Sequence, residues 1–320
     1  MSTTAPPLLQ PTRFRHEALL WHGRDELLAG TVPVIDAALT EGLPVMVALT
    51  GQTWGPIRAA LGHEAASRVH HVDMTQLGTN PARIIPAWLD FLASCGGRPA
   101  RGINEPLWAG RRRAEVTECH VQEAALNLAI PAGAPLSLLC PYNGDSLDAS
   151  ALSQARRTHP LVATAWGSAH SDHYRGTGRD QTLGAGGLPR PPLRSHRLAF
   201  RRGELGEVRR FVIRHATAAG LGDDRSDDLA LAVNELAANS IDHGGGRGVA
   251  RVWRDHGALV VEVSDSGRIA DPLAGRLNPG VAQERGRGLW IANQLCDLLQ
   301  VRSTREGTAL RVVTWLPTGA

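Results

Sequence analysis

The fold of the C-terminal half is decided by one stretch of ten residues, Asn234-Glu-Leu-Ala-Ala-Asn-Ser-Ile-Asp-His243. They belong to a helix predicted to begin near Asp224 and to end at the glycines that follow His243. The apolar positions of this helix keep helical spacing and form one stripe: Leu229, Ala232, Val233, Leu236, Ala237 and Ile241. Glu235 and Asn239 lie off the stripe and four residues apart, so their side chains project from one face.

A carboxylate and an amide at this spacing suit a hard cation and a reacting hydroxyl. The amide oxygen of Asn239 can ligate Mg²⁺, and Glu235 can accept the proton of an attacking hydroxyl. Taken alone, the pair is more typical of two solvated residues on a surface helix.

Two strand ends add polar groups to the same half. A predicted strand, Ala258–Ser264, runs directly into Asp265-Ser-Gly267. A carboxylate at a strand end can accept a hydrogen bond from an exocyclic amine such as that of adenine, and Gly267 lets the base approach. A plain turn is the competing interpretation of this tripeptide. Thr308, at the start of the last predicted strand, offers a hydroxyl to a nucleotide.

The stretch Glu284-Arg-Gly-Arg-Gly-Leu289 precedes another predicted helix. Gly286 and Gly288 leave backbone N–H groups free to face an anion, and the helix dipole favours phosphate there. Arg285 and Arg287 add positive charge beside them.

These stretches together resemble the motifs of the GHKL ATPases. In chain order they are similar to the N box (234–243), the G1 box (265–267), the G2 box (286–288) and the end motif (307–308). The closest resemblance is to the RsbW-type anti-sigma kinases, whose N box begins with a glutamate four residues before the metal-binding asparagine. The resemblance implies a Bergerat α/β sandwich over residues 196–320, and we expect a mixed sheet with helices on one face.

The resemblance also implies a role for each matching residue. Glu235 would be the general base, Asn239 the Mg²⁺ ligand and Asp265 the adenine-binding residue. Further nucleotide contacts are expected from Gly267, Arg285, Gly286, Arg287, Gly288 and Thr308. His243 is interpreted as structural, because a phosphoacceptor histidine is expected on a separate dimerising hairpin that the sequence does not show.

The complete absence of lysine excludes several other enzyme classes, because all 34 basic residues are arginine. A Walker A loop, a eukaryotic-type protein kinase and a pyridoxal enzyme each need a lysine. ATP must therefore be bound by another design.

The N-terminal half alternates short apolar runs with helical patterns, which predicts an α/β domain with a mainly parallel sheet. The expected strands are Ala18–Trp21, Val45–Leu49, Val69–Val72 and Leu136–Cys140. The expected helices are Asp25–Leu39, Pro56–Leu61, Ala82–Ala93, Ala114–Leu128 and one after Leu147. The turn at 50–56 has neither the spacing nor the lysine of a phosphate loop.

Residues 14–165 resemble the MEDS sensory domain, through the stretches 80–88, 105–111, 118–127 and 138–142. This resemblance implies that the half senses a small-molecule ligand or a partner. Residues 166–195 are rich in Gly, Pro and Ser and are predicted to form a flexible linker.

One group of metal-ligating residues stands out in this half. Cys119, His120 and Glu123 share a predicted helix, and Cys140 lies on a predicted strand. Cys119 and Glu123 are four residues apart, but His120 points about 100° away from Cys119. Core cysteines and ordinary helix polarity are the favoured interpretation.

The composition predicts a cytoplasmic protein. The four cysteines show no C-x-x-C spacing, and no export signal or long apolar run is visible. The net charge of +3 is small and its basic residues are scattered, so neither nucleic acid nor a membrane is an expected partner.

The combined interpretation is a cytoplasmic anti-sigma factor with ATP-dependent protein serine/threonine kinase activity, regulated by an N-terminal sensory domain. ATP and Mg²⁺ are the expected cofactors, and a sigma factor and an anti-anti-sigma (STAS) protein are the expected partners. A homodimer is expected from the family alone. The alternatives are a non-catalytic ATP-binding module that sequesters a sigma factor or STAS protein, and a histidine-kinase-like signalling ATPase.

Overall fold

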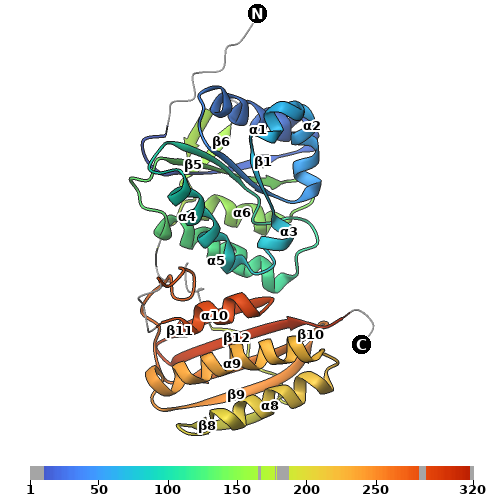
Figure 1. Cartoon of the computed structure of the whole chain (residues 1–320), viewed down its shortest axis with the longest axis vertical. Helices are drawn as coiled ribbons and strands as arrows, with labels where there is room; N and C mark the ends of the chain where they lie inside the picture. The colour runs from blue at the N-terminus through green and yellow to red at the C-terminus, as the bar shows by residue number, and fades with distance from the viewer. Residues whose placement is uncertain (1–10, 165–166, 177, 179–186, 281–285, 318–320) are drawn as a thin grey trace, which may run out of the picture. The chain divides into compact units, whose positions relative to one another are not determined.

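The computed structural model describes residues 11–164, 167–176, 178, 187–280 and 286–317. The chain divides into two compact units, one made of residues 1–78 and 87–177 and the other of residues 79–86 and 178–320. Figure 1 labels the helices and strands of both units, and each unit is described by itself.

The first unit contains a seven-stranded sheet in the order β3-β2-β4-β5-β1-β6-β7. Its strands are β1 (Arg15–Trp21), β2 (Val45–Leu49), β3 (His70–Asp73), β4 (Ala100–Asn104), β5 (Leu136–Asn143), β6 (Leu161–Thr164) and β7 (Gly167–His170). The pair β6–β7 is antiparallel and every other neighbouring pair is parallel, which confirms the predicted mainly parallel α/β fold.

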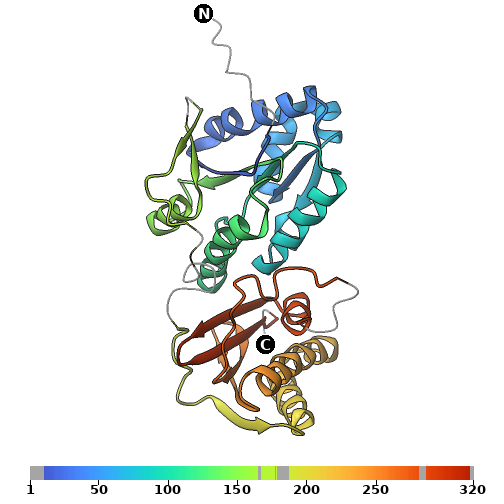
Figure 2. The same cartoon turned by 90° about the vertical axis from the view of Figure 1, so that its left-hand side faces the viewer.

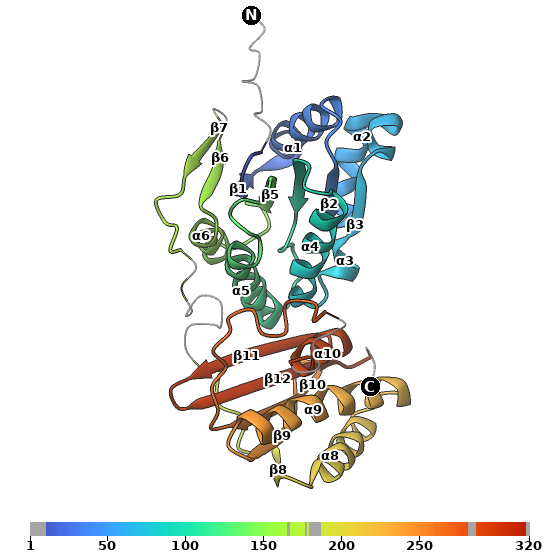
Figure 3. The same ribbon diagram turned by 60° about the vertical axis from the view of Figure 1, so that its left-hand side comes forward.

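Helices cover both faces of this sheet, as Figures 1 and 3 show. They are α1 (Gly23–Thr40), α2 (Gly51–Ser67, kinked at Gly62), α3 (Met74–Leu77), α4 (Ile84–Ser94), α5 (Arg113–Ala129) and α6 (Ala149–Thr158). The 3-10 turn η1 (Pro81–Arg83) and the first residues of α4 belong by the division above to the second unit. The helices α1 and α2 pack against the face that carries Leu19, Val47 and Leu139. On the opposite face, Trp88 of α4 packs so closely on Gly102 that a Cβ there would lie 2.5 Å from its ring.

Three strands of this sheet, β4, β6 (Leu161–Thr164) and β7, were not predicted. The strand β4, Ala100-Arg-Gly-Ile-Asn104, lacks a run of apolar residues and depends on Gly102 for its contact with Trp88. The edge strand β7, Gly167–His170, lies inside the stretch predicted as linker, and all four of its residues are exposed. A strand with no buried face leaves no alternating pattern to detect.

The turn before α2 holds a carboxylate of the chain itself. Oε2 of Glu105 accepts hydrogen bonds from N–H and Oγ1 of Thr50, both at 2.8 Å, and Oε1 accepts from Oγ1 of Thr53 at 2.6 Å. Glu105 is thus bonded to the N-cap residue of α2, Thr50, and to the hydroxyl of Thr53 in its first turn.

In its described residues, the second unit is a five-stranded sheet, in the order β11-β12-β10-β9-β8, with three helices on one face (Figure 2). Its strands are β8 (His196–Arg201), β9 (Arg247–Asp255), β10 (Ala258–Asp265), β11 (Leu298–Thr304) and β12 (Gly307–Trp315). Its helices are α8 (Leu205–Ala218), α9 (Asp223–His243) and α10 (Gly288–Leu295). The core lies between this helical layer and the sheet.

The predicted fold class is confirmed, with one correction to the sheet of the second unit. A mixed sheet was expected, but every neighbouring pair of its described strands is antiparallel. The reason is that two hairpins, β9–β10 and β11–β12, join side by side through β10 and β12. The predicted helix Leu289–Leu299 also ends earlier, at Leu295, because Leu298 and Leu299 pair with β12 as the start of β11.

Among the described residues, no helix is both long and apolar enough to cross a lipid bilayer.

Candidate functional site

Helix α9 directs Glu235 and Asn239 toward the start of α10. The apolar stripe of α9 is buried against the sheet, whereas these two side chains are half-buried. A Cβ atom added to Gly288 would lie 2.9 Å from Nδ2 of Asn239 and 3.2 Å from Oε2 of Glu235. The carboxylate and the amide therefore meet at the first residue of α10, where its free N–H groups begin.

Asp265, the last residue of β10, is held in one orientation by two hydrogen bonds. Its Oδ2 accepts from Oγ of Ser240 at 2.6 Å, and its Oδ1 accepts from the Gly267 N–H at 2.7 Å. Each carboxylate oxygen keeps a second acceptor site. Ser240 directly follows Asn239 on α9, so one helix positions both the Asn239 amide and the Asp265 carboxylate.

Glycines let the backbone close around this carboxylate. A Cβ on Gly244 would lie 2.4 Å from Cγ of Asp265, and one on Gly267 would lie 2.6 Å from the carbonyl oxygen of His243. Thr308, which is paired with Asp265 between β12 and β10, donates from Oγ1 to the Gly267 carbonyl at 2.9 Å. The turn at residues 265–267 is therefore hydrogen-bonded both to α9, through Ser240, and to β12, through Thr308.

These residues border a cavity of about 360 Å³. Of the predicted site residues, Asn239, Asp265, Gly267, Gly286 and Thr308 line it. Its other walls include the apolar side chains Ile269, Leu273, Ala274, Leu277 and Leu289. Apolar walls beside the Asp265 carboxylate fit a flat heteroaromatic ring, and the glycines at 267 and 286 leave room for the sugar and phosphates of a nucleotide.

The other predicted residues lie around this cavity or outside the described residues. Glu235 and Gly288 lie together at the start of α10. Arg287 precedes that helix and donates from Nη2 to the Gly280 carbonyl at 3.3 Å. Arg285 falls among residues 281–285, which the structure does not describe. The roles of all these residues stay predictions.

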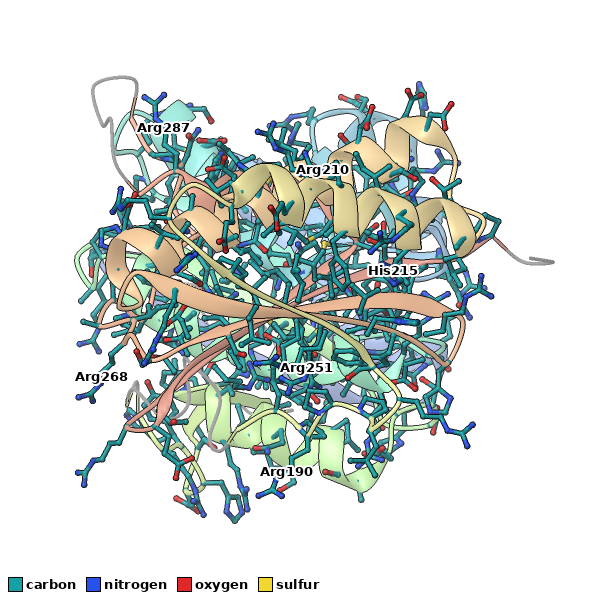
Figure 4. All side chains as sticks on the ribbon, turned by 90° about the horizontal axis from the view of Figure 1, so that it is seen from below. Arg190, Arg210, His215, Arg251, Arg268 and Arg287 are labelled. Atoms are coloured by element: carbon teal, nitrogen blue, oxygen red, sulfur yellow. The ribbon has the colours of Figure 1, made fainter. Side chains whose placement is uncertain are left out.

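The sequence did not single out Ser240, Gly244 or Arg268. Arg268 lines the cavity, is exposed and extends outward at the edge of the molecule in Figure 4. The run of glycines after His243 was a signal for a close backbone approach, whereas a helical serine carries no such signal. The role of Ser240 follows only from the folded structure, in which α9 packs beside the end of β10 and Ser240 bonds to Asp265.

The metal-ligating residues suggested in the first unit separate into two sets. Cys119 points away and donates from Sγ to the Pro106 carbonyl at 3.1 Å, and burial lowers the pKa of His120 to about 4. Neither belongs to a described group of potential ligands, whereas Glu123 and Cys140 do, together with two histidines that the sequence did not single out.

Comparison with protein families finds two domains in this chain. Residues 198–314 match the histidine kinase-like ATPase domain, so the second unit carries a domain of that class. Residues 15–160 match MEDS, described as the MEthanogen/methylotroph, DcmR Sensory domain. The chain therefore combines a MEDS domain with a kinase-like ATPase domain, as in a regulatory protein, which confirms the predicted resemblance. No curated protein matches the chain.

A substitution at Gly288 tests the convergence of α9 and α10. In Gly288→Ala, the new Cβ displaces the Asn239 amide, while the alanine itself suits a helix start. We expect an unchanged melting temperature and about tenfold weaker binding of a fluorescent ATP analogue in the presence of Mg²⁺. Gly280→Ala, where a Cβ has open space, is the control. Equal affinities of both variants would contradict this geometry.

Proposed function

We propose that this chain is an anti-sigma factor with ATP-dependent protein serine/threonine kinase activity toward an anti-anti-sigma (STAS) partner. Under this proposal the MEDS domain regulates the kinase, a sigma factor is the alternative partner, and the protein acts in the cytoplasm as a homodimer. The observation that carries the proposal is the position of Glu235, beside Asn239 and at the N-terminus of α10. A pure binding module needs no proton acceptor at that point.

Each of the site residues has a separate role in the proposed phosphoryl transfer. Asp265, fixed by Ser240 and Gly267, accepts a hydrogen bond from the adenine amine. The N–H groups at the start of α10 hold phosphate oxygens, and Asn239 offers an amide oxygen to the metal. Bound Mg²⁺ supplies neutralisation of phosphate charge. Oε2 of Glu235 accepts the proton of the incoming serine or threonine hydroxyl and orients its oxygen.

The proposal predicts one phosphorylated hydroxyl on the STAS partner. The purified chain is incubated with Mg-ATP and a candidate STAS protein from the same organism, and phosphosites are located by mass spectrometry. A single modified serine or threonine that requires both ATP and the chain is the expected result. A stable complex that carries no phosphate would make the protein a binding module, and label on a histidine of this chain would make it a histidine kinase.

A further inference from the structure

The first unit contains a buried group of polar side chains that the proposed function does not use. It consists of His16 on β1, Glu123 on α5, Cys140 on β5 and His159, which follows α6; Figure 3 shows these elements. The side chains of His16 and Glu123 are at most 1% exposed, and Cys140 and His159 are fully buried. One potential ligand atom from each residue lies within 4.8 Å of all the others.

Hydrogen bonds fix which nitrogen of His16 faces this cluster. Nδ2 of Asn127 donates to the carbonyl oxygens of Glu123, at 3.1 Å, and of Thr158, at 2.8 Å. Oδ1 of Asn127 is thereby the acceptor that faces Nδ1 of His16 at 3.0 Å, so Nδ1 carries the hydrogen. In the neutral ring, Nε2 then points a lone pair at Cys140 Sγ (3.4 Å) and Glu123 Oε2 (3.3 Å).

The same reasoning applies to His159. Its Nδ1 lies 2.8 Å from the carbonyl oxygen of Ala155, which can only accept, so Nδ1 again carries the hydrogen. Its Nε2 lies 2.9 Å from Oε2 of Glu123 but has no partner in hydrogen-bond geometry. Two lone pairs and a carboxylate therefore converge in a fully buried site, an arrangement that a cation stabilises.

Other buried donors orient the remaining two side chains. Oδ1 of Asn104 accepts from Nε1 of Trp88 at 3.2 Å, so Nδ2 of Asn104 faces Glu123 Oε1 at 3.3 Å and Cys140 Sγ at 3.9 Å. The Tyr142 hydroxyl donates to Oε2 of Glu123 at 3.3 Å. Hydrogen bonds of this kind hold the ligands of protein metal sites in place.

We propose that His16, Glu123, Cys140 and His159 bind one Zn²⁺ ion. With bonds of about 2.0–2.3 Å to nitrogen, oxygen and sulfur, a tetrahedral zinc site has ligand separations of about 3.3–3.7 Å. The separations of Nε2 of His16 from Sγ of Cys140 and from Oε2 of Glu123, 3.4 and 3.3 Å, already have this size. Imidazole and thiolate donors favour zinc over Mg²⁺ or Ca²⁺.

Charge and burial define the kind of zinc site. The thiolate of Cys140 and the carboxylate of Glu123 together cancel the charge of the ion, and the thiol proton leaves to solvent when zinc binds. Four protein ligands with no exposed surface leave no position for a reacting water, which is typical of a structural site. The ion would tie β1, β5, α5 and the residue after α6 together, independently of the kinase proposal.

The first test measures metal in the full-length chain. We expect about one zinc per chain by mass spectrometry of protein purified without chelator. After removal of zinc, added Co²⁺ should give the intense visible bands of a tetrahedral site and a near-ultraviolet thiolate-to-cobalt band. Protein that is folded but has no zinc, together with a weak octahedral Co²⁺ spectrum, would overturn the proposal.

Variants then assign the ligands. Cys140→Ser should abolish the thiolate band, and His159→Gln should reduce bound zinc to below about 0.1 per chain. Cys119→Ser is the matched control, because Cys119 is equally buried on α5 but bonds to Pro106, and it should keep both signals. Asn127→Ala should keep zinc with about 10- to 100-fold lower affinity, since Asn127 only positions His16. An unchanged thiolate band in Cys140→Ser would contradict the assignment.

Discussion

Replacing Glu235 by alanine is expected to lower phosphoryl transfer to the STAS partner by about 10²–10⁴-fold, the usual contribution of a general base. Nucleotide affinity should change little, because Glu235 faces the start of α10 and is not among the residues that line the cavity. The rate is measured in single-turnover reactions by mass spectrometry of the phosphorylated partner, and the affinity by titration with a fluorescent ATP analogue.

A charge-matched control separates proton transfer from electrostatics. Asp228 is an exposed carboxylate on α9, two helical turns before Glu235 and on the same side. Asp228→Ala removes the same charge at a distance from the site, so its transfer rate should match that of the unmodified chain. If Glu235→Ala transfers phosphate at the normal rate, Glu235 is not the base.

Local pattern was enough to predict the elements that carry the ATPase motifs. The stripe that includes Leu229, Leu236 and Ile241 defines the buried side of α9, and that side determines where Glu235 and Asn239 point. The alternation of Leu259, Val261 and Val263 places β10 on the core and leaves Asp265 at its end. Each of these predictions depends on residues within one element.

Contacts between distant segments were not predictable in the same way. His16, Cys140 and His159 come together only because β5 and β6 both pair with β1, a register that no local spacing encodes. The sequence instead drew attention to Cys119 and His120, which are neighbours of Glu123 along α5 but do not belong to its buried group. For the same reason Ser240 was missed, since its partner Asp265 lies 25 residues away.

Replacing Asp265 by asparagine is expected to weaken ATP binding by about 10- to 100-fold, the effect of losing a hydrogen bond to a charged group. The asparagine can retain an acceptor for Ser240 or for the Gly267 N–H, but its NH₂ group then faces one of the donors. Asp271→Asn is the matched control, because Asp271 also lines the cavity but accepts from the Leu273 N–H in its own turn. That variant should bind ATP normally.

The choice of nucleotide makes this test specific for the adenine contact. Adenine presents an amine where guanine presents a carbonyl oxygen, and an asparagine NH₂ can donate to that oxygen. Asp265→Asn should therefore lose affinity for ATP more than for GTP, which lowers the ratio of the ATP affinity to the GTP affinity. Calorimetric titration with each nucleotide measures the two dissociation constants. An equal loss for ATP and GTP would mean that Asp265 only shapes the turn with Gly244 and Gly267, and that another group reads the base.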